Sequence, residues 1–244
     1  EGLRCAMIGT ALRRTGQGGF NPGVISWHTA FWASDPGWSN PGDGNAVSSW
    51  RDYSGNGHTA TQASGSLQPL FRSSVSALNN QPAVEFDGSN DAMATASFTA
   101  VPQTLSVVVV FKALTLSNID FLYDGLADPN RCIVYLNGTV TMQFYSGTDV
   151  NTGLAMTTNA QLFRATHAGA SSVLERNGTS LGTFSTGTNS MTGITLCNRG
   201  PGDTGTAGNM QIAFFGLYAG DVSANANWST FKAGVASTYG LTIA

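Results

Sequence analysis

The stretch LSVVVVF at residues 105–111 is the longest apolar run of the chain. Valine and phenylalanine favour strands, and a run this apolar, without regular polar alternation, indicates a strand that is buried on both faces. The run is much shorter than the roughly 20 residues that a helix needs to cross a bilayer. We therefore predict a central strand of a covered sheet, and no membrane insertion.

Shorter segments of the same kind lie on both sides of this run, and turn-forming residues separate them. Asn137-Gly138 and Asn177-Gly178 each join two such segments. An Asn-Gly pair favours a type I′ hairpin, because both central residues of that turn need a positive φ. The predicted strands are residues 83–86, 105–111, 133–136, 140–145, 173–176, 180–184 and 210–218.

Helical spacing occurs in one segment, residues 224–239, where Trp228, Phe231 and Val235 follow one another at i, i+3 and i+7. Many short strands with so little helix predict an all-β domain of two antiparallel sheets. We therefore expect a jelly-roll β-sandwich with a short C-terminal helix.

The chain is poor in charge. Charged residues make up 10% of its 244 residues, against about 25% in an ordinary soluble protein. This composition excludes charge-driven disorder, coiled coils and helical bundles, which need abundant Glu, Lys and Arg. The 11 basic and 14 acidic residues give a net charge of −3, so we expect no nucleic-acid partner.

The first 24 residues differ from the rest of the chain. They hold three of the 11 basic residues, Arg4, Arg13 and Arg14, followed by a stretch rich in glycine. Such a composition favours a flexible arm that lies on a partner or on its own domain. We therefore divide the chain into an attachment arm, residues 1–24, and one domain, residues 25–244.

Three cysteines, Cys5, Cys132 and Cys197, lie far apart in the sequence. An odd number leaves at least one thiol unpaired within a single chain, and no pair has the close spacing of a zinc site. The spacing is compatible both with a Cys132–Cys197 bridge and with buried free thiols.

Two longer stretches carry a family resemblance. WRDYSGNGH at residues 50–58 and PAVEFDGSND at residues 82–91 resemble the opening of a laminin-G-like domain, a member of the concanavalin A-like lectin and glucanase superfamily. Residues 105–112, the strand that ends at Asn177-Gly178, and the tail from residue 212 to residue 241 resemble later parts of such domains. The resemblance covers about residues 25–242 and implies the jelly-roll fold.

Domains of this kind occur on phage tails, on capsid surfaces and in secreted bacterial proteins. Together with the basic arm, the resemblance implies a non-catalytic protein on the virion surface of a tailed phage, displayed in many copies. Its arm would attach to other virion proteins, and its domain would present loops to host-surface glycans. The alternative is a secreted protein that binds or degrades polysaccharides. A structural protein without a ligand is a third interpretation.

The sequence lacks the catalytic patterns of the superfamily's enzymes. Its three glutamates, Glu1, Glu85 and Glu175, do not form the Glu-x-Asp-x-Glu strand with which glucanases place two carboxyl groups about 5 Å apart. Ala213 and Thr230 stand where the alginate-lyase motifs have histidine and tyrosine. We therefore predict that the protein is not an enzyme.

Lectin-like sites stack a pyranose on an exposed aromatic ring and hold its hydroxyls with Asn, Asp or Gln. Trp38 lies in a loop rich in Gly, Pro and Asn, with Asn40 and Asp43 close by, and is the first candidate. Tyr145, at the end of a hairpin strand, is the second. Packing in the core is the competing and commoner role of a tryptophan.

Some members of the superfamily bind Ca²⁺ at the rim of the sandwich, through Asp side chains and loop carbonyls. Asp87 and Asp91 lie on one turn and are the candidate ligands. The alternative is a structural role, because aspartate also favours turns through hydrogen bonds to its own backbone. We expect no other cofactor.

Overall fold

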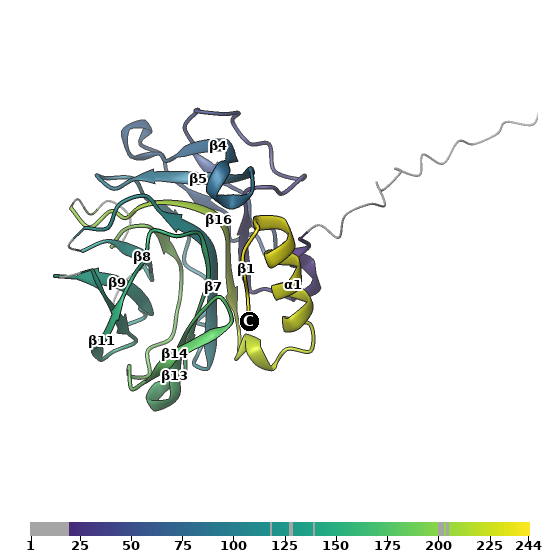
Figure 1. The fold of residues 1–244 in the computed structure, drawn as a ribbon. Coiled ribbons are helices and arrows are strands. Elements are labelled where there is room, and N and C mark those ends of the chain that lie inside the picture. Colours follow the sequence, from purple (N-terminus) through teal and green to yellow (C-terminus); the bar gives the residue numbers. More distant parts are fainter. Residues whose placement is uncertain (1–19, 118, 127–128, 139, 200–202, 204) are drawn as a thin grey trace, which may run out of the picture.

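Two antiparallel β-sheets of eight strands each lie face to face (Figure 1). The computed structural model describes residues 20–117, 119–126, 129–138, 140–199, 203 and 205–244. The predicted all-β sandwich with a single C-terminal helix is confirmed. Among the helices in these ranges, none is long and apolar enough to span a membrane.

The first sheet has the strand order β14–β13–β12–β7–β16–β5–β4, and β1 pairs with the second half of β16. Its strands are β1 (Thr29–Trp32), β4 (Leu70–Val75), β5 (Gln81–Asp87), β7 (Leu105–Ala113), β12 (Gln161–His167), β13 (Ser172–Arg176), β14 (Thr179–Phe184) and β16 (Asn209–Tyr218).

The second sheet has the strand order β11–β10–β9–β8–β15–β6–β3–β2. Its strands are β2 (Ser49–Trp50), β3 (Ala60–Thr61), β6 (Met93–Thr95), β8 (Phe121–Asp124), β9 (Ile133–Asn137), β10 (Thr141–Tyr145), β11 (Asp149–Ala155) and β15 (Thr195–Leu196). Short 3₁₀ helices lie in the connections, namely η1 (Pro22–Val24), η2 (Gly65–Leu67), η3 (Ser76–Leu78), η4 (Gly169–Ser171) and η5 (Val222–Ala224).

Strand β7 lies at the centre of the first sheet, between β12 and β16. All side chains of the predicted run, residues 105–111, are fully buried. Val107 and Val109 face the second sheet, whereas Val108 and Val110 face the outer layer. The prediction of a strand covered on both faces is confirmed.

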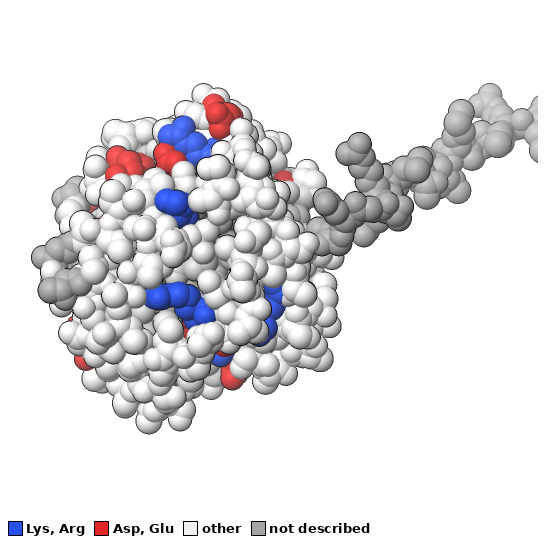
Figure 2. All heavy atoms as spheres, in the orientation of Figure 1, with Lys and Arg blue, Asp and Glu red and all other residues white. Residues whose placement is uncertain are grey.

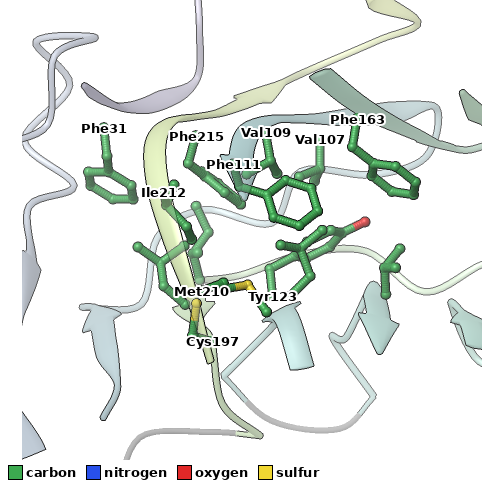
Figure 3. Packing of buried hydrophobic residues seen from close by; sticks show 14 of the residues in the cluster. Phe31, Val107, Val109, Phe111, Tyr123, Phe163, Cys197, Met210, Ile212 and Phe215 are labelled. Carbon is green, nitrogen blue, oxygen red and sulfur yellow. The ribbon is translucent and has the colours of Figure 1, made fainter. Parts of the chain in front are cut away.

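Aromatic and aliphatic side chains fill the space between the sheets (Figure 3). Phe215 of β16 meets Tyr123 of β8 edge to face, with ring centroids 5.9 Å apart and an interplanar angle of 70°. Such contacts add about 0.5–1.5 kcal/mol beyond the burial of the rings. They hold the two sheets in one alignment.

Helix α1 (Trp228–Tyr239) covers the outer face of the first sheet (Figure 1). The predicted spacing is confirmed, since Trp228, Phe231 and Val235 are all buried in the cluster that includes Val108 and Val110. The helix begins at Trp228 rather than at residue 224, because η5 forms a separate turn before it.

Residues 20–24 pack on this same outer layer. The ring of Phe20 lies 5.1 Å from that of Phe231 and 5.4 Å from that of Phe214. Its amide also donates to the hydroxyl of Thr238 at 2.7 Å. Packed structure therefore begins no later than Phe20, before the predicted boundary at residue 25. The attachment residues Arg4, Arg13 and Arg14 lie outside the described residues.

The two Asn-Gly turns differ. Asn177 and Gly178 have φ values of 50° and 81°, and the flanking residues Arg176 and Thr179 pair with each other, so the predicted two-residue hairpin is confirmed. In the other hairpin Asn137 still belongs to β9 and pairs with Thr141. The type I′ prediction is wrong there, because the connection is one residue longer.

Both cysteines of the described residues, Cys132 and Cys197, are buried free thiols. Burial raises the pKa of Cys132 to about 12, so its thiol stays protonated and unreactive at neutral pH. Of the two interpretations open from the sequence, the structure has the free thiols.

A polar chain crosses the core beside these thiols. His167 is fully buried, and its two ring nitrogens lie 2.8 Å from the hydroxyl of Tyr123 and 2.5 Å from that of Ser146. Burial lowers the pKa of His167 from 6.5 to about 3. The imidazole is therefore neutral in the folded protein and links the sheets through hydrogen bonds.

We expect Phe20→Ala to lower the free energy of unfolding by about 3 kcal/mol, because it empties an aromatic cluster under α1. Val24→Ala, in a half-buried neighbour, should cost less than about 1 kcal/mol. Urea unfolding of both variants measures the difference. Equal, small losses would mean that residues 20–24 contribute little to the domain.

The buried His167 should make stability depend on pH. Its pKa in the folded state lies below the unfolded value of 6.5, so the unfolded chain takes up a proton first as the pH falls. Below about pH 6.5 the free energy of unfolding of the wild type should fall by up to about 1.4 kcal/mol per pH unit relative to that of His167→Gln, because glutamine does not titrate.

Unfolding free energies of the two proteins between about pH 7 and pH 5 test this expectation. The difference between them is the quantity to follow, because burial raises the pKa of Asp91 to about 6 and this group contributes with the opposite sign. Parallel pH profiles would contradict a neutral His167.

Candidate functional site

A pocket of about 390 Å³ opens on the outer face of the second sheet, where β8, β9 and β10 lie side by side. Strand alternation explains which side chains line it. In β9, Val134 and Leu136 point into the core, so Ile133, Tyr135 and Asn137 point outward. All three line the pocket.

Aromatic rings form the floor of the pocket. Phe121 and Tyr135 stack, with ring centroids 4.8 Å apart and an interplanar angle of 13°. Tyr145 lines the pocket from the next strand, where it pairs with Ile133. The three rings come from three adjacent strands and line one pocket.

Polar groups surround this floor. The hydroxyl of Tyr135 donates to Oδ2 of Asp149 at 2.7 Å. Burial first, and then the hydrogen bond and charge of Asp149, raise the pKa of Tyr135, while the charges of Arg131 and Arg199 oppose this shift. The phenol therefore stays protonated, and both guanidinium groups lie near enough to act on it.

The two arginines of the pocket differ in their partners. Nε of Arg131 donates to Asp124 at 2.9 Å, a second nitrogen of the same group also binds that carboxylate, and both side chains are largely buried. Arg199 is exposed, and within the described residues its guanidinium has neither an ion pair nor a hydrogen bond. The charge of Arg131 is thus balanced by the protein, whereas that of Arg199 is open to solvent.

Ile119 lines the β8 side of the pocket and has two unusual properties. It is the one large hydrophobic residue of the described chain that counts as exposed, at 36%. Its φ is +87°, in a region that β-branched residues avoid because of steric strain. Strain of this kind is often retained where a side chain serves a ligand.

Another hollow, of about 400 Å³, lies beside β3 and β6. Small, uncharged side chains line it, among them Thr61, Ala63 and Ala94, and no aromatic ring takes part. The two hollows have similar volumes but are lined by different types of side chain. The pocket at β8–β10 combines stacked rings, hydrogen-bonding groups and charge, and it is the candidate site.

The structure corrects the leading sequence candidate. Trp38 is 8% exposed and belongs to the core between the sheets. Its ring stacks on Trp50 at 5.9 Å, and its Nε1 donates to the carbonyl of Ser49 at 3.0 Å. The prediction of an exposed stacking platform at Trp38 is wrong, because the loop folds its indole inward.

The other predicted binding residues separate into two places. Asn40 and Asp43 are exposed. The amide oxygen of Asn40 accepts a hydrogen bond from the backbone of Gly42, and the carboxylate of Asp43 accepts one from the backbone of Ser73. Neither lines the β8–β10 pocket, whereas Tyr145 does. The structure therefore does not bring the predicted set together, and carbohydrate binding at Asn40 and Asp43 stays a prediction.

The predicted calcium ligands, Asp87 and Asp91, share one turn. Oδ2 of Asp91 accepts from the amide of Asp87 at 3.0 Å, and Oδ1 of Asp87 accepts from Ser89 at 2.8 Å. Asp91 is buried, which raises its pKa to about 6. The described residues contain no cluster of three or more metal-ligating side chains, and calcium binding stays a prediction.

The sequence carries one signal for the outward side chains of the pocket. In residues 133–137 and 141–145, apolar core positions alternate with Tyr135, Asn137 and Tyr145. Period-two alternation of this kind indicates one solvent-facing side. It marks outward tyrosines on neighbouring strands, although it does not reveal Phe121, Asp149 or Arg199 as their neighbours.

No protein-family model and no curated protein matches the chain. Solved structures share its fold. A Trypanosoma rangeli sialidase in complex with sialic acid is 11% identical, with a TM-score of 0.55, over 86% of this chain and 32% of that chain. The receptor-binding domain of botulinum neurotoxin type G is 13% identical, with a TM-score of 0.52, over 78% and 51%.

A GH54 α-L-arabinofuranosidase is also similar, with 11% identity and a TM-score of 0.53 over 80% of this chain and 51% of that chain. The chain thus spans about a third of the sialidase and about half of the other two. Identities this low show the fold alone. That fold is a β-sandwich, which these chains of a sialidase, a receptor-binding domain and an arabinofuranosidase share with this protein.

These structures correct the prediction that the protein is not an enzyme. The fold is shared with chains of a sialidase and an arabinofuranosidase, so the fold gives no support to that exclusion. The prediction had rested on the missing Glu-x-Asp-x-Glu strand and on the missing alginate-lyase residues, and the absence of these two patterns does not exclude other catalytic arrangements.

We expect Ile119→Gly to raise the free energy of unfolding by about 1 kcal/mol, because glycine relieves the strain at a positive φ. Ile119→Val, which keeps the β-branch, should not. Chemical denaturation compares the three proteins. A glycine variant no more stable than the valine variant would show that Ile119 is not strained.

Proposed function

We propose that the β8–β10 pocket binds a sugar unit of a glycan. The observation that carries this proposal is the stacked pair of Phe121 and Tyr135 with Tyr145 in the same pocket lining, surrounded by hydrogen-bonding groups. A pyranose has an apolar face of C–H groups, which packs on an aromatic ring, and a rim of hydroxyls, which needs polar partners.

The polar groups of the pocket suit such a ligand. The amide of Asn137, the carboxylate of Asp149 and the hydroxyl of Thr206 line it together. They offer donors and acceptors around the aromatic floor, as sugar hydroxyls require. The volume of about 390 Å³ lies at the lower end of the range of about 300–1,000 Å³ for small-molecule pockets, which suits one or two sugar rings.

The similar structures support this proposal independently of the residues that line the pocket. One is a sialidase described with sialic acid, one is an arabinofuranosidase, and one is a receptor-binding domain. A fold used with glycans makes a glycan ligand the natural choice for an aromatic pocket, although function lives in the site and not in the fold.

Of the two settings expected from the sequence, this proposal favours the secreted carbohydrate-binding protein. Its support is the pocket and the fold, and neither depends on a virion. Attachment to a virion through residues 1–24, display in many copies and a place on the virion surface stay predictions. Glycan ligands are compatible with an extracellular site of action in either setting.

We expect Tyr145→Ala and Tyr135→Ala each to weaken glycan binding about tenfold, since each removes part of the stacking surface, worth about 1.4 kcal/mol. The matched control is Tyr218→Ala, which removes a partly buried tyrosine from the first sheet, as Tyr135 and Tyr145 are partly buried in the second. A glycan array followed by titration calorimetry with the bound oligosaccharide measures the effect.

Two outcomes would oppose the proposal. Binding that is unchanged in both pocket variants would place the glycan elsewhere on the molecule. A protein that binds no glycan at all would remove the proposed function. Products released during the incubation should be analysed in the same experiment, because turnover by this fold has to be seen if it occurs.

A further inference from the structure

Arg199 is unusual among the arginines of the described residues. Arg51, Arg72, Arg131 and Arg164 form ion pairs with carboxylates, and Arg176 donates to the carbonyl of Ala155 at 2.8 Å. The side chain of Arg199 has no such partner in this part of the chain. An arginine that lines a pocket and has no side-chain partner among the described residues is available to a ligand.

Charged side chains are few on this molecule, so the charge of Arg199 has a larger share in the local electrostatic potential. The chain has 11 Lys and Arg, three of them before residue 20, and two of the others line this one pocket. Figure 2 shows one face of the protein, on which the charged side chains gather in small groups and most of the surface is uncharged. A free guanidinium therefore has few competing charges around it.

The charges of the pocket lie on opposite sides of its floor. Asp149 belongs to β11, beyond β10, whereas Thr206 lies beside β8, where its carbonyl accepts from Phe121 at 3.2 Å. The amide of Arg199 donates to the hydroxyl of Thr206 at 3.3 Å, which puts Arg199 on the same side. β9 lies between the two sides. One end of the pocket thus accepts hydrogen bonds from hydroxyl groups, and the other end carries the solvent-exposed positive charge of Arg199.

We propose that the pocket selects acidic sugars, with the carboxylate of the sugar paired to Arg199 and its hydroxyls donating to Asp149. This inference rests on the proposed function and assigns its ligand class. A guanidinium presents two parallel N–H donors that match the two oxygens of a carboxylate. The negative Asp149 at the other end fixes the direction of the ligand, because it repels the carboxylate.

The arrangement of the remaining groups fits this direction. Arg131 is already held by Asp124, so it adds positive potential on the side of Tyr135 without being free to follow the ligand. Ile119 borders the pocket beside β8 and adds an apolar side chain to its lining.

The test is an array of oligosaccharides that carry carboxylates, namely oligomers of galacturonate, mannuronate and hyaluronan, each beside its carboxyl-reduced counterpart. The full chain should bind at least one acidic oligomer about tenfold more tightly than its neutral counterpart. Arg199→Gln should abolish this preference and keep the weaker binding of the neutral oligomer. Arg199→Lys should restore it in part.

The matched control is Lys232→Gln, which removes one positive charge from α1 on the far side of the first sheet. It should leave the preference intact, whereas an equal loss in both variants would mean that overall charge, and not the site, attracts the ligand. A sulfated oligomer without carboxylates that binds equally well would assign the pocket to anions in general and overturn the carboxylate assignment.

Different results would overturn the selection of acidic sugars and the binding of glycans. Equal binding of acidic and neutral oligomers, with Arg199→Gln unchanged and Tyr145→Ala weakened, would overturn the selection of acidic sugars and leave glycan binding in place. Absence of binding to every oligosaccharide of the array would remove the proposed function itself, and the selection with it.

Discussion

The structure depends on the pairing of β16 with β7, two apolar strands that have to be covered on both faces. Their register shifts between Ile212 and Phe214. Because of this bulge, Ala213 and Phe214 both face the outer layer, whereas Ile212 and Phe215 face the second sheet. The outer layer needs a cover, which α1 and Phe20 supply, and the inner face needs a second sheet.

The second sheet differs from the first in how its two faces are used. Only its inner face is packed against the core, so its outer face carries alternating side chains that meet solvent. Where β8, β9 and β10 run side by side, those outward positions are Phe121, Tyr135 and Tyr145. The first sheet uses both faces for stability, which leaves the outer face of the second free for binding.

The electrostatics of the site follow from the low charge of the whole chain. Four of the six arginines in the described residues form ion pairs with carboxylates, such as Arg164 with Glu175 at 2.7 Å. In the pocket, Arg131 follows that rule and Arg199 does not. Tyr135 lies between Asp149 and these arginines, so one phenol links an acceptor end and a cationic end.

The sequence alone determined what depends on near neighbours in the chain. The apolar run of β7, the turn at Asn177-Gly178 and the buried face of α1 follow from side-chain periodicity and turn chemistry, which act over a few residues. Local patterns cannot say which strands become neighbours. The inward turn of Trp38, and the presence of Tyr145 and Arg199 in one pocket, were therefore decided only by the tertiary structure, because pairing and packing between distant segments set them.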